Sequence, residues 1–158
     1  MKSKTLKAIS KGRAVHLIDI ENLCMDSNPT EAMVAAAKSA YVKKVNPGPN
    51  DLFYVTVSSK GNLVPVLFGW TGATHAFKEG HDGADILLAE LILNGDLETR
   101  FEKVFLASGD GGLAPFASSL LSKGVALEVV SAPRALATQY RFIGAPVTYI
   151  RPELELAA

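Results

Sequence analysis

The feature that most constrains the fold of this chain is an alternation of short apolar runs with segments of helical periodicity. The run "AVHLIDI" (14–20) is almost continuously apolar, and similar runs cover 52–59, 103–108 and 125–131. Strands of this kind are buried on both faces, which is typical of parallel sheets. The sequence therefore predicts an α/β fold with a central parallel sheet and helices on both of its faces.

The segments between these runs carry helix signals of different strength. "SNPTEAMVAAAKSAYVKK" predicts a helix from Pro29 to about Lys44, with Asn28 as its N-cap and Glu31 as the capping-box acid. The other patterns predict helices over 82–96, 113–123 and 132–142, a short helix around Pro65, an edge strand at 74–77 and a last strand at 146–150.

The length of 158 residues is that of one ordinary domain. We expect a basic arm over 1–13, a single domain over 14–152 and a C-terminal tail over 153–158. The arm holds five of the sixteen basic residues and no acid, so both a phosphate-binding arm and a solvated end are open. The rest of the chain has eleven basic and sixteen acidic residues, a net charge of −5.

The composition also excludes some classes of protein. The single cysteine, Cys24, excludes an internal disulfide, which fits a reducing cytoplasm. No apolar run approaches the ~20 residues of a membrane span, and the basic start lacks the apolar core of a secretion signal. We therefore expect a cytoplasmic protein that does not bind membranes. A homo-oligomer is compatible with the sequence.

Three aspartates fall where a parallel sheet places its binding crevice, beyond the carboxyl ends of the strands. Asp19 ends the first apolar run, Asp110 follows the run 103–108, and Asp85 begins an apolar helix. Each has an ordinary explanation, as a turn former, a helix cap or an acid that answers a helix dipole. Together they form a cage of the hard oxygen ligands that Mg²⁺ and Mn²⁺ favour. Asp82, three residues before Asp85, is a further candidate ligand.

Other polar residues are weaker candidates. Asn22 is placed to bond a phosphate, to orient a metal-bound water or to fix the aspartate before it, and Glu21 is a possible further ligand. His16 lies inside a buried run and is interpreted as a core residue. Lys78, Arg134 and Arg141 are candidate phosphate contacts or ordinary surface charges.

Three motifs occur in the order "LIDIENL", "DGADILLAELI" and "VFLASGDGGLAPFASSLLSKGVALEVV". In this order they resemble the NYN domain, a branch of the PIN-like nucleases, over residues 14–150. The resemblance implies a three-layer α/β/α sandwich of PIN-like, Rossmann-like type with a central, mainly parallel sheet. It also implies a ribonuclease in which metal-activated water hydrolyses the phosphodiester bond.

The resemblance assigns roles to individual residues. The family's motif positions fall on Asp19 and Asn22 of "DIEN", Asp85 of "GAD" and Asp110 of "SGD". We therefore expect the three aspartates to be catalytic and, with Asp82, to hold Mg²⁺ or Mn²⁺. Substrate contacts are expected at the following residues: Asn22, Ser108 and Gly109.

One motif departs from the family pattern. Many relatives carry a second acid two residues after the aspartate of "SGD", where this chain has Gly112. Two interpretations stay open, a slow ribonuclease with a weaker metal site and a module that binds RNA or a protein partner without cutting. A phosphatase of the haloacid dehalogenase type has less support, because it expects an aspartate at Glu21 and further acids after "GDG".

Overall fold

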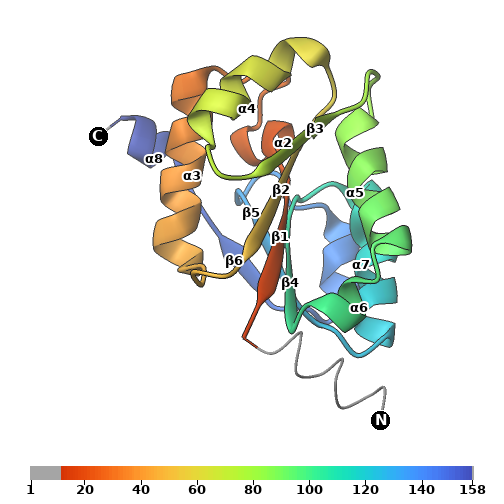
Figure 1. Cartoon of the computed structure of the whole chain (residues 1–158). Helices are drawn as coiled ribbons and strands as arrows, with labels where there is room; N and C mark the ends of the chain where they lie inside the picture. Colours follow the sequence, from red (N-terminus) through yellow and green to blue (C-terminus); the bar gives the residue numbers. More distant parts are fainter. Residues whose placement is uncertain (1–11, 158) are drawn as a thin grey trace.

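A parallel sheet forms the centre of the computed structural model, which describes residues 12–157. All neighbouring strands are parallel, and their order across the sheet is β3-β2-β1-β4-β5-β6 (Figure 1). The strands are β1 (Ala14–Asp19), β2 (Leu52–Val57), β3 (Thr74–Phe77), β4 (Lys103–Ala107), β5 (Ala126–Ser131) and β6 (Val147–Tyr149). The predicted α/β class with a central parallel sheet is confirmed.

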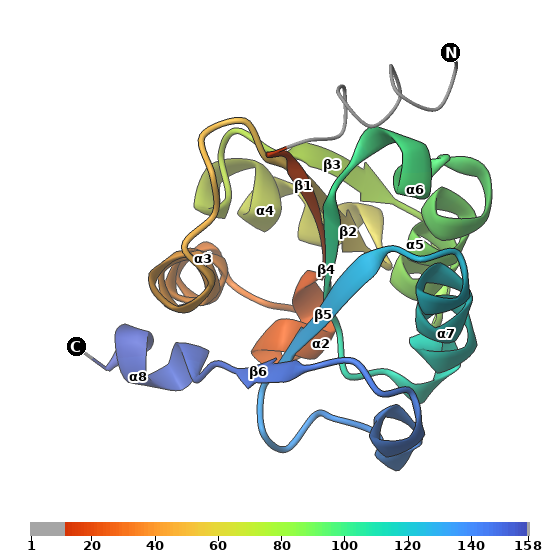
Figure 2. The same ribbon diagram turned by 90° about the horizontal axis from the view of Figure 1, so that it is seen from below.

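Helices cover both faces of the sheet, so the molecule has three layers (Figure 2). One layer contains α2 (Ile20–Cys24), α3 (Glu31–Val45), α4 (Leu63–Gly69) and α8 (Pro152–Leu156). The other layer contains α5 (Gly83–Asn94), α6 (Leu97–Arg100) and α7 (Ala114–Ser122). Short 3₁₀ helices lie in the connections, namely η1 (Lys60–Asn62), η2 (Gly111–Leu113) and η3 (Thr138–Phe142).

The alternation of side chains along β1 separates two apolar cores. Val15 and Leu17 pack into the core that includes residues of α5 and α7, whereas Ile18 packs into the core under α3 and α4. The same alternation turns Asp19 toward the layer that contains α5. The strand therefore aims its last carboxylate at the helix that carries Asp85.

Most of the predicted elements are present, including the short helix around Pro65 and the edge strand at 74–77. The predicted N-cap of α3 is wrong. The helix begins at Glu31, and Thr30 caps it, because its Oγ1 accepts a hydrogen bond from the Met33 N–H at 3.1 Å. Asn28 instead lies in a preceding turn, where its N–H donates to Asp26 at 2.8 Å.

The predicted helix over 132–142 is also wrong, because only η3 forms there. The Ala137 N–H donates to the carbonyl of Gly109 at 2.8 Å, a residue far away in the sequence. In an α-helix this N–H would donate to the carbonyl of Pro133. A tertiary hydrogen bond has therefore replaced a local one.

His16 is confirmed as a core residue. Its ring is fully buried between the rings of Phe53 and Phe105, and its Nδ1 lies 2.6 Å from the Tyr41 hydroxyl. Burial lowers the pKa of His16, although Asp51 acts in the opposite direction. The residue therefore packs inside the core, between the neighbouring strands β2 and β4.

The strand order reverses between β1 and β4, because the chain passes from β1 to β2 on one side and returns to pair β4 on the other. In open α/β sheets, ligands bind beyond the carboxyl ends of the strands at such a switch point. Asp19 ends β1, and Asp110 follows β4. Both aspartates therefore lie at the position that this architecture favours for a site.

The remaining predictions concern the basic arm, the C-terminal tail and the absence of a membrane span. The predicted basic arm lies outside the described residues, except for Gly12 and Arg13. The predicted tail begins within α8, which packs on α3 and places Glu155 2.8 Å from Lys43 Nζ. Within residues 12–157, no helix has both the length and the apolar character that crossing a bilayer requires.

Candidate active site

A pocket of about 280 Å³ opens at the carboxyl edge of the sheet. We call it the acid pocket, because six of its twelve lining residues are acidic and none is Lys or Arg. The acids are Asp19, Glu21, Asp26, Asp82, Asp85 and Asp110. The structure thus brings together the three aspartates that the sequence singles out.

Asp19 is held in the acid pocket by two hydrogen bonds. Its Oδ1 accepts from the Asn22 N–H at 3.2 Å, which caps α2, and its Oδ2 accepts from the Ser108 hydroxyl at 3.2 Å. The side chain is almost fully buried, and burial raises the pKa of Asp19 to about 6. A nearby cation would favour the ionised form and offset this effect of burial.

Asp85 contributes a carboxylate oxygen that has no partner. It lies in the first turn of α5, and its Oδ1 is buried without a hydrogen bond to any group in residues 12–157. Burial, together with the negative charges of Asp19 and Asp110, raises the pKa of Asp85 to about 8. An unsatisfied buried carboxylate oxygen is costly, so this position favours a proton or a cation.

Asp110 caps a short helix and also lines the acid pocket. Its Oδ1 accepts from the Gly112 N–H at 2.7 Å and thereby caps η2, and the same residue lines the acid pocket. A carboxylate has a second oxygen and several lone pairs. Capping the helix therefore does not prevent Asp110 from binding a cation.

Hydrogen bonds join the segment that carries Asp19 to the segment that carries Asp110. They involve the three residues that the sequence predicts as substrate contacts. The Gly109 N–H donates to Asn22 Oδ1 at 2.8 Å, and Ser108 Oγ accepts from the Asp110 N–H at 3.2 Å. Ser108 and Gly109 are buried and these polar groups are engaged within the chain, so we assign them to positioning the acids. Asn22 lines the acid pocket, and its contact with a substrate stays a prediction.

Two further acids of the pocket bond to neighbouring groups. The carboxylate of Glu21 accepts from the Ser58 N–H at 3.0 Å and from Asn62 Nδ2 at 2.6 Å. Asp82 is exposed and lies 2.9 Å from Nδ1 of the exposed His81. Both acids add negative charge to the pocket, and a ligand role for Asp82 stays a prediction.

Thr56 is a site residue that the sequence did not single out. It is buried in β2, and its Oγ1 lies 3.3 Å from the carbonyl oxygens of both Ile18 and Ala84. These carbonyls directly precede Asp19 and Asp85, so Thr56 ties together the backbones that carry the two acids. The only sequence signal for this role is a polar residue inside an apolar strand.

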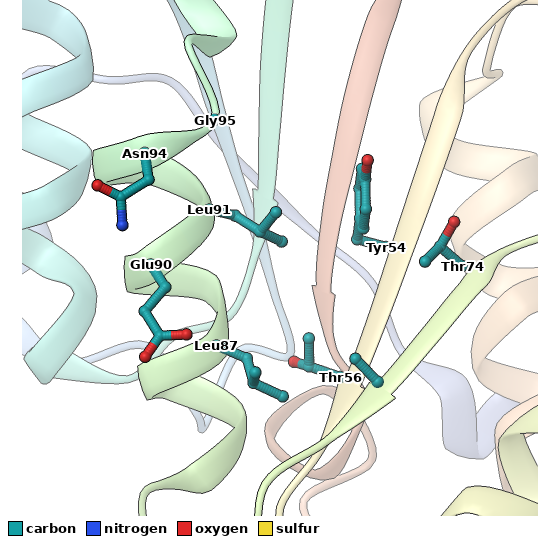
Figure 3. Close-up of a pocket in the computed structure, with 9 residues that line it drawn as sticks. Tyr54, Thr56, Thr74, Leu87, Glu90, Leu91, Asn94 and Gly95 are labelled. Carbon is teal, nitrogen blue, oxygen red and sulfur yellow. The ribbon is translucent and has the colours of Figure 1, made fainter.

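A second cavity, of about 340 Å³, lies between α5 and the strands β2 and β3 (Figure 3). Figure 3 shows Leu87 and Leu91 of α5 facing Tyr54 and Thr74 across it. Its walls are largely apolar, and Glu90 is the one acid among its lining residues. It lacks a group of converging carboxylates, so we place the chemistry in the acid pocket.

The acid pocket fits Mg²⁺ or Mn²⁺ by the chemistry of its oxygens, but its side chains do not form a finished coordination shell. Within residues 12–157, no three His, Cys, Asp or Glu side chains are already arranged to hold a metal ion. The unpartnered Oδ1 of Asp85 nevertheless offers a buried ligand beside two other carboxylates. Binding would require side-chain rotation or intervening waters, which Mg²⁺ commonly keeps.

Comparison with known proteins does not assign this chain to a family. No model of a protein family matches this chain, and no curated protein sequence matches it. The likeness to the NYN domain is therefore carried by the three sequence motifs and stays a prediction.

Proposed function

We propose that the protein is a metal-dependent ribonuclease that hydrolyses RNA phosphodiester bonds at the acid pocket. The observation that carries the proposal is the buried, unpartnered Oδ1 of Asp85 beside the carboxyl groups of Asp19 and Asp110. Three ionised carboxylates in one pocket repel one another, and a divalent cation would remove this repulsion and satisfy the free oxygen.

The residues of the pocket have separate roles in this proposal. Asp19, Asp85 and Asp110 would hold one or two Mg²⁺ or Mn²⁺ ions, with Asp82 as a further ligand. When bound, the cation would supply a water of lowered pKa and positive charge beside the phosphate. Asn22 fixes the turn at Gly109 through its amide oxygen, which leaves its amide nitrogen to donate to a phosphate oxygen.

RNA as the substrate and the cytoplasm as the location belong to the same proposal. The choice of RNA is supported by the resemblance to the NYN domain. A cytoplasmic location is supported by the sole cysteine, Cys24, because a chain with one cysteine forms no internal disulfide.

The competing candidate is a module of the same fold that binds RNA or a protein partner without cutting. Two observations favour it. Gly112 stands where many NYN relatives carry an acid, and no finished coordination shell is present in the described part of the chain. The two candidates differ in whether a divalent cation produces cleavage.

A cleavage assay separates the two candidates. Purified protein is incubated with a short labelled RNA in Mn²⁺, Mg²⁺ or EDTA. We expect slow cleavage that is faster in Mn²⁺, because Mn²⁺ binds more tightly and is less demanding of geometry. Asp19→Asn and Asp110→Asn should abolish it, whereas Glu31→Gln, which alters an exposed acid of α3, should leave it unchanged.

Circular dichroism of each variant confirms that it is folded. Cleavage that persists in EDTA, or in the Asp110→Asn protein, would contradict the proposal. An absence of cleavage in every metal, with RNA binding that survives both aspartate substitutions, would support the binding module instead.

A further inference from the structure

The connection between β5 and β6 is fastened to the turn that carries Asp110. We call residues 132–146 the β5–β6 loop. Within it, the Ala137 N–H donates to the Gly109 carbonyl at 2.8 Å, and the Tyr140 hydroxyl donates to the Asp110 carbonyl at 2.7 Å. Tyr140 is buried, so the loop has a fixed position beside the acid pocket.

The contact between this loop and the turn is close enough to exclude a side chain at Gly109, where an added Cβ would lie 2.2 Å from the carbonyl oxygen of Ala135. At Gly111 an added Cβ would lie 2.8 Å from Nε2 of the exposed Gln139, whose side chain can move aside. Two glycines of "SGDGG" therefore provide the surface against which the β5–β6 loop rests.

The same loop presents an aromatic ring and two cations to solvent. Phe142, the last residue of η3, is 88% exposed, the largest value among the exposed large hydrophobic side chains of residues 12–157. It follows Tyr140 by two residues, which span at most about 7 Å of chain. Arg134 and Arg141 are exposed as well, and neither joins an ion pair within the described residues.

These groups supply what the acid pocket lacks. Its lining holds six acids and no Lys or Arg, so it repels the phosphates of an approaching nucleic acid. A single exposed apolar residue is ordinary on a protein surface. Phe142 directly follows Arg141, and Arg134 lies on the same loop, which is bonded to Asp110. The loop therefore offers an exposed ring on which a base can stack and two cations that can contact phosphates.

We propose that the β5–β6 loop binds an unpaired nucleotide of RNA, with its base stacked on Phe142 and its neighbouring phosphates contacted by Arg134 and Arg141. This inference rests on the proposed function for the choice of RNA, but it does not require cleavage. In a duplex, both faces of each base are covered by the neighbouring bases. A ring on this loop therefore selects single-stranded RNA over duplex RNA and tolerates many sequences.

Fluorescence anisotropy with a short labelled single-stranded RNA, and with its duplex, tests the inference in the presence of Ca²⁺. Phe142→Ala should weaken binding of the single strand by roughly 5- to 100-fold, whereas Phe142→Tyr should keep the affinity. Arg134→Ala and Arg141→Ala should each lower the salt slope by about one. Phe68→Ala is the matched control, because Phe68 is 66% exposed on α4, outside the loop.

The outcomes separate this inference from the proposed function. Mn²⁺ binding by the Phe142→Ala protein, measured by calorimetry, should be unchanged, because the ring is not a ligand. Unchanged affinity for single-stranded RNA in Phe142→Ala, an equal loss in Phe68→Ala, or no RNA binding by the wild-type protein would overturn the inference. RNA binding that depends on Phe142 without cleavage in any metal would overturn the nuclease alone.

Discussion

Asp85, the proposed metal ligand, makes the stability of the metal-free protein depend on pH. Burial and the carboxyl groups of Asp19 and Asp110 raise its pKa from the ordinary 3.8 to about 8 in the folded protein. The folded chain therefore holds this proton more tightly than the unfolded chain does. The stability that this contributes is fully present below about pH 4 and is lost as the pH rises through about 8.

We expect Asp85→Asn to stabilise the metal-free protein in a pH-dependent manner. The uncharged amide avoids the cost of a buried negative charge, so the gain in Tm should be small near pH 4 and largest above about pH 8. Thermal unfolding in EDTA across this range, followed by circular dichroism, measures it. A loss of Tm at high pH, or a gain independent of pH, would contradict the assigned cause. Added Mn²⁺ should raise the Tm of the wild-type protein more than that of the variant.

Gly112 is a position at which a substitution tests the proposed metal site. A Cβ placed there would meet only Asp110 Oδ1, at 3.0 Å, and the backbone is not in the left-handed region. Gly112→Asp would add a carboxylate beside Asp110 without disturbing the core. We expect Mn²⁺ to bind at least about tenfold more tightly, because ligand charge sets affinity in oxygen-ligand sites.

Calorimetric titration with Mn²⁺ checks this expectation. Gly112→Ala is the matched control, because it adds the Cβ without a charge and should leave the affinity unchanged. Equal affinity in the aspartate and alanine variants would place residue 112 outside the metal site.

Among the contacts between elements, the one that joins the β5–β6 loop to the turn after β4 leaves no room for a methyl group at Gly109. Gly109→Ala would bring a methyl group within 2.2 Å of the Ala135 carbonyl oxygen and 2.7 Å of Ser131 Oγ. Relieving such overlaps costs about 1–3 kcal/mol. We expect the free energy of unfolding, measured in urea, to fall by this amount, whereas Gly112→Ala should change it little. A neutral Gly109→Ala would show that the loop is free to move.

The elements also show which parts of the fold a sequence predicts. Parallel strands place their carboxyl ends at one edge, so the positions of Asp19 and Asp110 along two apolar runs were enough to bring them together. Helix α2 was missed, because five residues are too few to show a period. The hydrogen bonds of Ser108 to Asp19 and of Ala137 to Gly109 join distant segments, and no local pattern encodes them.

At the scale of the whole molecule, the distribution of charge predicts that the proposed RNA binding depends on divalent cations. Residues beyond the first thirteen carry eleven basic and sixteen acidic residues. We therefore expect RNA affinity to be higher in Mn²⁺ than in EDTA at equal ionic strength, and to fall between about 50 and 200 mM KCl in both. Anisotropy titrations measure this, and the cation effect should disappear in the Asp19→Asn protein. Equal RNA affinity in Mn²⁺ and in EDTA would show that the cation does not contribute to RNA binding.

The pairing of β1 with β4 also determines when the acid pocket can form during synthesis of the chain. Ser108 and Asp19, which bond across this pair, are separated by 89 residues, so their contact cannot form before β4 has been made. During synthesis, β1 leaves the ribosome long before β4, and Tyr140 follows Asp110 by a further 30 residues. A growing chain therefore carries single aspartates but no assembled pocket. If the pocket is the ribonuclease site that we propose, a nascent chain cannot cleave RNA before the segment that carries Asp110 has been made.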